Sequence, residues 1–370
     1  MSSPHESDAH ASARPTTHAD ALATFGWTGR WEALHHAFLA DEPAANGASS
    51  VARVTRVDRG AVRVAPPEPA RQVRLRPGAE PVAVGDWVVV DAAYERVLGH
   101  LPRTGTLVRR DPNGHDVQAV AANVDVVLVV CGLDRPVKDG RIERAVAQTW
   151  DAGAVPLVVL TKADVLTDGD PDPDEVADDV AATSPGLEAI ATSTVDGRGL
   201  DRVTAAVAGR TVVLIGESGA GKSSLVNALV PDGDAAVGRV RHGDAKGRHT
   251  TTRRELHPVG DGTVVIDTPG IRQLGLWLDP EAVEASFSDI DDLSEGCRFR
   301  DCRHEQEPGC AVAAAAETGE LDPDRLARFL RMRYEAEALE IVRDPAARRR
   351  KERQFGRIQK EAQRIARGLK

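Results

Sequence analysis

The sequence has no apolar run long enough to cross a membrane, because no stretch approaches the ~18 consecutive apolar residues that a spanning helix needs. The N-terminal stretch MSSPHESDAHASARPTTHAD also lacks the basic start and apolar segment of a secretion signal. These absences predict a soluble, cytoplasmic protein with no membrane partner. A positive charge excess is missing as well. The formal net charge of -10 argues against indiscriminate nucleic-acid binding by the whole chain.

Cysteine is scarce, with four in 370 residues, and three of the four crowd into one short segment. Cys297, Cys302 and Cys310 lie around His304 in the spacing C-x4-C-x-H-x5-C. Three thiolates and one imidazole make a full tetrahedral set with no open position for water, which predicts one structural zinc ion. Cys131 stands apart at the end of the run VDVVLVV, where we expect a buried thiol.

The length of 370 residues is enough for two to three domains of ~150 residues each. An apolar island from Leu22 to Phe38 predicts a short helix or clip near the N-terminus. Short β-branched runs then predict a small β-barrel, and beyond Asn123 strands alternate with helices, which predicts an α/β domain with a mostly parallel sheet. The predicted domains are a largely disordered extension at 1–48, the barrel at 49–110, the α/β domain at 111–278 and a zinc-binding domain with a basic helical tail at 279–370.

Two basic regions stand out against the overall negative charge. Arginines interleave with the apolar positions of the barrel strands from Arg53 to Arg76, so one face either meets a phosphate backbone or is simply solvated. The tail from Arg348 onward carries ten Lys and Arg residues against two Glu. That balance favours a local RNA-contact element over a solvated terminal helix.

The chain is organised around a phosphate-binding loop that begins at Gly216. The loop matches G-x-x-x-x-G-K-S, follows the apolar run 211–215 and precedes apolar residues at helical spacing. Glycines let backbone N–H groups approach phosphate oxygens closely, Lys222 would reach the β/γ-phosphates, and the Ser223 hydroxyl would bind Mg²⁺. The predicted nucleotide-binding residues of this loop are Gly216, Glu217, Ser218, Gly219, Ala220, Gly221, Lys222, Ser223 and Ser224.

Two upstream loops predict that the base is guanine. The motif T-K-A-D at 161–164 follows the expected strand 155–160, where the Asp164 carboxylate can accept two hydrogen bonds from the N1–H and N2–H₂ edge of guanine. Adenine offers no such pair of donors. Backbone N–H groups after the next strand would supply a second contact. The predicted base-contacting residues are Thr161, Lys162, Ala163, Asp164, Ser193 and Thr194.

A third group of motifs predicts a switch that senses hydrolysis. Asp267-Thr268-Pro269-Gly270 ends the expected strand 263–266, so Asp267 would hold Mg²⁺ through a water and Gly270 would offer its N–H to the γ-phosphate. Upstream, the hydroxyl-rich segment 247–252 is expected to close over Mg²⁺, with either Thr250 or Thr251 as ligand. The predicted magnesium ligands are therefore Ser223, Asp267 and one of these two threonines.

The usual water-positioning residue is missing from the sequence. Switch GTPases carry a glutamine directly after D-x-x-G, and this chain has Ile271 there. Intrinsic hydrolysis should therefore be slow, and another residue or a partner must help. His249 lies in the expected switch and could orient water, although a solvated loop histidine is an equal alternative. The predicted catalytic residues are His249 and Lys222.

The order of these motifs differs from that of ordinary GTPases, because the guanine motifs come before the phosphate loop. This order is that of circularly permuted GTPases. With a barrel before it and a Cys₃His segment after it, the chain resembles the ribosome small-subunit-dependent GTPase A (RsgA) family from about Val51 to the C-terminus. The resemblance rests on LPR at 101–103, AANVD at 121–125, TKAD, GESGAGKSS, GRHTTT, DTPG, and CRFRDCRH with EPGC.

The resemblance implies an OB-fold barrel and hydrolysis of GTP to GDP and phosphate, stimulated by the small ribosomal subunit during its late maturation. It also implies contact with that subunit's rRNA, the catalytic role of His249 and the four zinc ligands. Thr161 replaces the commoner Asn, and Ser193-Thr194 replaces Ser-Ala. We expect a monomer. The alternatives are an RNA-binding module that uses GTP as a structural ligand with little turnover, and a P-loop kinase or ATPase, against which T-K-A-D argues.

Overall fold

The computed structural model describes residues 17–42, 45, 47, 49–67, 69–76, 78, 80–110, 117–184, 186–229, 254–267, 280–305 and 307–343. The chain divides into two compact units, one made of residues 1–145 with 152–276 and the other of residues 146–151 with 277–370. The domain boundaries drawn from the sequence stay predictions. Among the described residues, no helix is both long and apolar enough to cross a membrane.

Two helices precede the first strand: α1 (His18–Thr24) and α2 (Gly29–Asp41). Thr17 begins α1 with a capping box, because its hydroxyl accepts from the Asp20 N–H at 3.1 Å while the Asp20 carboxylate accepts from the Thr17 N–H at 3.0 Å. Apolar side chains of the island become buried, among them Leu22 and Trp31. The sequence predicted a short helix or clip over the apolar island, and the structure has the helices α1 and α2 there.

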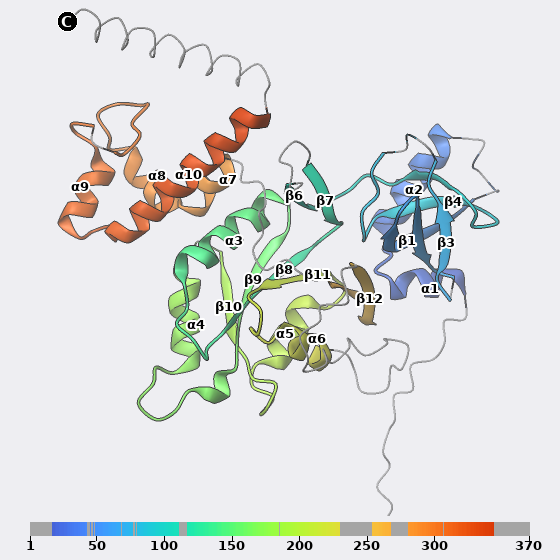
Figure 1. Ribbon diagram of the computed structural model, residues 1–370, viewed down its shortest axis with the longest axis horizontal. Helices are drawn as coiled ribbons and strands as arrows, with labels where there is room; N and C mark the ends of the chain where they lie inside the picture. The colour runs from blue at the N-terminus through green and yellow to red at the C-terminus, as the bar shows by residue number, and fades with distance from the viewer. Residues whose placement is uncertain are drawn as a thin grey trace, which may run out of the picture. The chain divides into compact units, whose positions relative to one another are not determined.

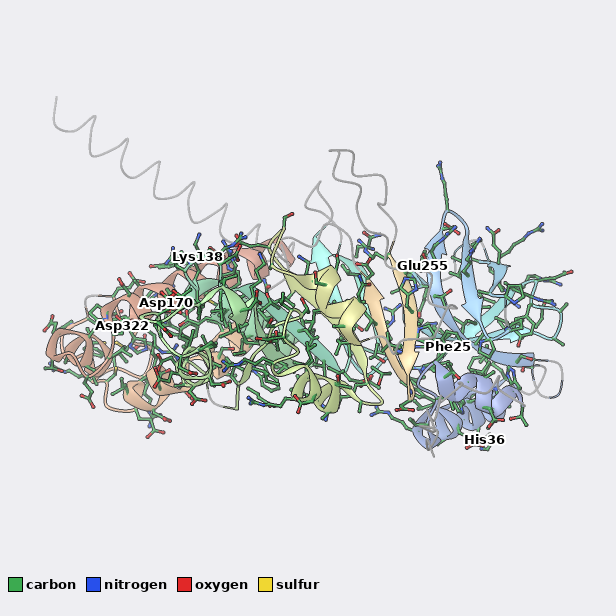
Figure 2. The ribbon with its side chains drawn as sticks, turned by 90° about the horizontal axis from the view of Figure 1, so that it is seen from below. Phe25, His36, Lys138, Asp170, Glu255 and Asp322 are labelled. Carbon is green, nitrogen blue, oxygen red and sulfur yellow. The ribbon has the colours of Figure 1, made fainter. Side chains whose placement is uncertain are left out.

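The N-terminal sheet has five antiparallel strands in the order β3-β2-β1-β4-β5. Alternating valines from its strands form one buried cluster, as period-two alternation predicts. Figure 2 shows Phe25, which follows α1, and His36 of α2 beside this sheet. The strands are β1 (Ser49–Asp58), β2 (Ala61–Ala65), β3 (Arg71–Arg74), β4 (Trp87–Asp91) and β5 (Val97–His100).

A two-stranded hairpin, β6 (Thr106–Arg110) with β7 (Val117–Ala122), follows the N-terminal sheet. Asn123 ends β7 in a left-handed conformation at φ 57. Its amide donates to the Gly85 carbonyl at 3.0 Å and accepts from the Thr104 N–H at 3.0 Å. Asn123, which follows β7, thus joins the end of the hairpin to the segment before β4 and to the segment after β5.

The larger sheet has six strands in the order β10-β9-β8-β11-β13-β12, and only β12 runs antiparallel to its neighbour. The expected α/β class with a mostly parallel sheet is confirmed. Figure 1 shows these strands with their accompanying helices. The strands are β8 (Val126–Gly132), β9 (Val155–Thr161), β10 (Glu188–Ala191), β11 (Thr211–Gly216), β12 (Glu255–Gly260) and β13 (Thr263–Asp267). The helices are α3 (Asp139–Asp151), α4 (Pro173–Ala181), α5 (Leu200–Val207) and α6 (Lys222–Leu229). A 3₁₀ turn lies at Ala163–Val165.

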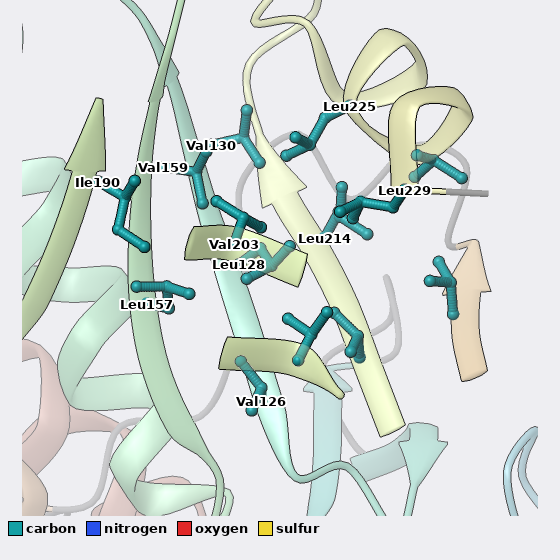
Figure 3. Close-up of a cluster of buried hydrophobic side chains, with 14 of the residues drawn as sticks. Val126, Leu128, Val130, Leu157, Val159, Ile190, Val203, Leu214, Leu225 and Leu229 are labelled. Carbon is teal, nitrogen blue, oxygen red and sulfur yellow. The ribbon is translucent and has the colours of Figure 1, made fainter. Parts of the chain in front are cut away.

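Side chains from the central strands form the core of this sheet. Leu128 of β8 and Leu214 of β11 meet Val203 of α5 and Leu225 of α6 in one buried cluster (Figure 3). Near-continuous apolar strands are what a parallel sheet that is covered by helices requires. The cluster lies beneath the loop that joins β11 to α6, so it fixes the position of that loop.

The second unit is helical among its described residues. Its helices are α7 (Pro280–Ser286), α8 (Ser288–Ser294), α9 (Ala311–Thr318) and α10 (Pro323–Arg343). Phe287 and Phe329 pack in its core with ring centroids 5.4 Å apart and ring planes tilted by 58°. Cys310 is buried in the same core, so the cysteine segment is anchored by apolar packing.

Candidate functional site

The strand order of the larger sheet reverses direction between β8 and β11. From β8 the sheet continues to β9 and β10, whereas from β11 it continues the other way to β13. Ligands of open α/β sheets bind at such a reversal, outside the carboxyl ends of the strands. The loops that follow β8, β9 and β11 therefore face a common site.

The phosphate-loop sequence forms the turn between β11 and α6. Gly216 lies at φ 147, and a Cβ added there would stand 2.2 Å from the Val130 carbonyl oxygen. Gly219 and Gly221 also have positive φ, at 80 and 88. Lys222 begins α6 and donates from Nζ to the carbonyls of Gly216 and Glu217, each at 2.7 Å. The glycines are thus required by the close approach of β8 and by the curvature of the loop.

Thr161 joins the guanine loop to the phosphate loop. Its hydroxyl donates to the Ala220 carbonyl at 2.6 Å, and its side chain is buried. A Cβ on Gly221 would lie 3.1 Å from the Thr161 Oγ1. The two loops therefore pack against each other although 59 positions separate the bonded residues.

Asp164 and Ser193 meet as the sequence motifs suggested. The Ser193 hydroxyl donates to Asp164 Oδ1 at 2.7 Å and accepts from the N–H groups of Val195 at 3.0 Å and Asp196 at 3.3 Å. Thr194 is exposed at the same turn. The structure thus brings the 161–164 and 193–194 loops together, with one carboxylate oriented by a buried serine.

The loop after β8 adds charged residues that motif reasoning did not identify. Lys162, left-handed at φ 62, donates from Nζ to Asp134 Oδ2 at 2.8 Å. Arg135 donates to the same carboxylate at 3.0 Å. Hydrogen bonds from Arg135 and from Lys162 hold the pKa of Asp134 well below its ordinary value. Asp134 and Arg135 directly follow a buried parallel strand, and that position was the one available signal.

Glu217 of the phosphate loop is contacted by two arginines. Arg141 of α3 pairs with Glu217 Oε1, and the Arg135 Nη1 lies 3.8 Å from Glu217 Oε2. A chain of charges thus runs from Lys162 through Asp134 and Arg135 to the phosphate loop.

Asp267 ends β13, the strand next to β11. Burial raises the pKa of its carboxyl group, while the positive charges of His257 and Lys222 act against that rise. A half-buried carboxylate near the phosphate-loop lysine suits a cation ligand. Of the other predicted residues, His249, Thr250, Thr251 and Gly270 lie outside the described residues, and so does the tail from Arg348.

The predicted zinc ligands converge in the second unit. The ligand atoms of Cys297, Cys302, His304 and Cys310 all lie within 4.8 Å of one another, so the group could hold a metal ion. Cys297 Sγ is 3.9 Å from Cys310 Sγ, and His304 Nδ1 is 3.6 Å and 3.5 Å from these two sulfurs. A tetrahedral zinc site has edges of about 3.8 Å between sulfurs and about 3.5 Å between sulfur and nitrogen. The donor set therefore fits a metal of that size.

Burial lowers the pKa of His304, and the charge of Arg333 lowers it further. The imidazole is thereby favoured in the neutral form that a metal ligand requires. Sequence spacing identified all four side chains of this group.

A central phosphate-loop strand, with guanine loops on strands that precede it in the chain, defines a circularly permuted P-loop GTPase. The family model described as RsgA GTPase matches residues 100–277. The "Small ribosomal subunit biogenesis GTPase RsgA" of Streptomyces coelicolor is 39% identical over 364 residues, which are 94% of this chain and 96% of that one. That of Streptomyces avermitilis is 40% identical over 319 residues, 84% of each chain. The chain belongs to the RsgA family of GTPases, which are hydrolases acting on GTP, and the resemblance seen in the sequence is confirmed.

Two solved structures share the fold. The "Crystal structure of YjeQ from Thermotoga maritima" superposes with a TM-score of 0.58 at 25% identity, over 78% of this chain and 98% of that one. The structure of "YloQ, a circularly permuted GTPase" gives a TM-score of 0.56 at 24% identity, over 81% and 97%. The permuted fold expected from the motif order is therefore confirmed.

Proposed function

We propose that the protein binds the small ribosomal subunit and acts in its late maturation, hydrolysing GTP to GDP and phosphate with stimulation by the subunit. The main support for GTP binding is the hydrogen bond from the Thr161 hydroxyl to the Ala220 carbonyl, which joins the guanine loop to the phosphate loop. The subunit part rests on the printed name of relatives that align with nearly the whole chain. Such a role places the protein in the cytoplasm.

Different residues would contact the phosphates, the base, Mg²⁺ and the attacking water. Backbone N–H groups of 216–223 and the Lys222 ammonium would bind the phosphates, and the oriented Asp164 carboxylate would accept from the guanine edge. Ser223 and Asp267 would hold Mg²⁺, which neutralises phosphate charge when bound. In the proposed reaction a water oxygen attacks the γ-phosphorus, the bridging bond to the β-phosphate breaks, and the water's proton passes to the released phosphate. His249 would orient that water, because Ile271 has no group that can.

Turnover of GTP and of ATP, each with and without purified small subunits, tests this function. We expect GTP hydrolysis to be slow alone and at least tenfold faster with subunits, and ATP to be a poor substrate. Equal GTP turnover in both conditions would contradict the subunit role. Tight GTP binding with negligible turnover in both conditions would favour an RNA-binding module that keeps GTP as a structural ligand.

Contact between the five-stranded N-terminal sheet and rRNA is a separate part of the proposal. Arg63 of β2 and Arg74 of β3 are exposed on one face of neighbouring strands. Arg71 is exposed at the start of β3, and its guanidinium lies over the Tyr94 ring, 5.7 Å from its centroid. Positive groups beside an aromatic face suit single-stranded RNA. Arg71→Glu with Arg74→Glu should weaken subunit binding and flatten its salt dependence. Unchanged binding would remove this surface from the interface. Sedimentation should find the free protein monomeric.

We further propose that the Cys₃His group holds one structural zinc ion. Four protein ligands leave no open position, so the ion would stabilise the second unit and take no part in hydrolysis. Elemental analysis should find one zinc per chain, and Cys310→Ser should lose it and lower the unfolding temperature. The control Cys131→Ser should keep the zinc. A chain without stoichiometric zinc whose unfolding is unaffected by chelator would overturn this assignment.

A further inference from the structure

A permanently charged side chain lies against the outside of the phosphate loop. A Cβ added to Gly219, in the middle of the loop, would stand 3.6 Å from Arg135 Nη2. The same guanidinium is held by Asp134 at 3.0 Å on one side and approaches Glu217 at 3.8 Å on the other. Arg135 therefore lies beside the phosphate loop, and it shares the Asp134 carboxylate with Lys162 of the guanine loop.

The present partners of Arg135 hold it weakly. Its side chain is 42% exposed, and those of Asp134 and Glu217 are 30% and 35% exposed. Ion pairs of this exposure contribute little to stability, because water and salt screen them. A nucleotide triphosphate concentrates several negative charges at the same loop, and a planar guanidinium binds phosphate oxygens in a bidentate manner. A bound nucleotide can therefore replace Asp134 and Glu217 as the partner of Arg135 with little loss of free energy.

We propose that Arg135 is a built-in catalytic arginine, which contacts the phosphates of bound GTP and stabilises the charge that develops when the γ-phosphate leaves. The inference rests on the proposed GTP hydrolysis at this loop. As the bridging bond breaks, its electron pair moves to the β-phosphate oxygen, and a cation beside that oxygen lowers the barrier. Asp134 acts as a positioning residue that keeps the guanidinium beside Gly219 before nucleotide binds. Such a cation would compensate in part for the missing glutamine after D-x-x-G.

Arg141 provides the matched control because it shares a partner with Arg135 but comes from a different place. It pairs with Glu217 from the first turn of α3, whereas Arg135 approaches Gly219 itself. If the charge network only braced Glu217, removal of either arginine would have the same effect. If Arg135 contacts the phosphates, its removal alone slows the chemical step.

The experiment compares single-turnover GTP hydrolysis of wild type, Arg135→Ala, Arg135→Lys and Arg141→Ala, in the presence of small subunits. We expect Arg135→Ala to lose at least tenfold in rate, Arg135→Lys to recover little of it, and Arg141→Ala to stay within about threefold of wild type. The affinity for GDP, measured by fluorescence titration, should change by less than threefold for Arg141→Ala, and for the Arg135 variants it should fall by less than the hydrolysis rate does. Affinity for GDP with aluminium fluoride, which mimics the transferring phosphate, should fall for the Arg135 variants alone.

Two outcomes would overturn the proposal: hydrolysis by Arg135→Ala within twofold of wild type, or equal losses in Arg135→Ala and Arg141→Ala. Failure of the proposed function is a different result, because then the wild-type protein itself would not turn over GTP with subunits. Thermal unfolding of each variant checks that exposed substitutions leave the fold intact.

Discussion

The Thr161 hydroxyl donates a hydrogen bond of 2.6 Å to the Ala220 carbonyl, and both residues are buried. One belongs to the loop that would read the base and the other to the loop that would cradle the phosphates. In the permuted chain the base-reading loop comes first, yet the contact joins two neighbouring loops at one edge of the sheet. Spatial neighbours in this site are therefore preserved although the sequence order is changed.

We expect removal of the Thr161 hydroxyl to weaken nucleotide binding. Thr161→Val keeps the shape of the side chain but leaves the Ala220 carbonyl without this donor, at a cost of about 1–3 kcal/mol. Affinity for GDP and for GTP should each fall roughly tenfold or more in a fluorescence titration. Thr192→Val is the control, because its hydroxyl reaches only the Leu160 carbonyl, at 3.4 Å. Equal effects of the two substitutions would show that the Thr161 contact has no special role.

We expect substitution of Asp164 to change which base the protein prefers. Its carboxylate is oriented by the Ser193 hydroxyl at 2.7 Å, and it would accept from the two donors of the guanine edge. Asp164→Asn replaces an acceptor by a donor amide, so affinity for GTP should fall at least a hundredfold. Xanthosine triphosphate, which carries an oxygen where guanine has its amino group, should bind the variant better than GTP does. Competition titration measures the ratio, and unchanged GTP preference would remove Asp164 from base recognition.

The parts predicted well from the sequence are those with local rules. The phosphate loop, the 161–164 motif and the four metal-site side chains each lie in one short segment, and the apolar runs 155–160 and 263–266 lie within one residue of strands β9 and β13. Arg135 and Asp134 were missed because their role depends on which loops β8 brings together, which no local pattern encodes. The helices within 18–41 lie where the apolar island predicted a short helix or clip, and the burial of their apolar side chains stabilises them beyond helix propensity alone.

We expect the Cys131 thiol to react slowly with alkylating reagents. Burial raises its pKa to about 11, with Glu217 contributing and Arg141 opposing. The thiolate is the reactive form, so a raised pKa lowers reactivity at every pH below it. At pH 8 alkylation by iodoacetamide should be on the order of a hundredfold slower than for a free cysteine of pKa about 8.5. The structure leaves Cys131 half-buried, whereas the sequence predicted a buried thiol. Peptide mapping of the native and the denatured protein measures the contrast, and rapid native labelling at residue 131 would contradict the raised pKa.

Arg53 joins three segments that are distant in sequence. Its guanidinium donates to the Phe25 carbonyl after α1, to the Gly85 carbonyl at 3.2 Å and to the Thr211 hydroxyl at 2.7 Å. It is 1% exposed and lies over the Trp87 ring, 5.1 Å from the centroid. The N-terminal helices, the first sheet and the strand that leads to the phosphate loop are therefore held by one side chain.

Replacing Arg53 by methionine should destabilise the first unit strongly. Methionine fills much of the space but leaves three acceptors without their donor, and truncation of buried charged networks costs about 3–5 kcal/mol. Arg53→Lys should rescue little, because an ammonium group cannot reach three acceptors in the geometry of a guanidinium. Arg63→Met, on the exposed side of the neighbouring strand, should stay within about 0.5 kcal/mol of wild type. Denaturant unfolding compares the three, and a small loss for Arg53→Met would mean that these hydrogen bonds only offset the cost of burying the charge.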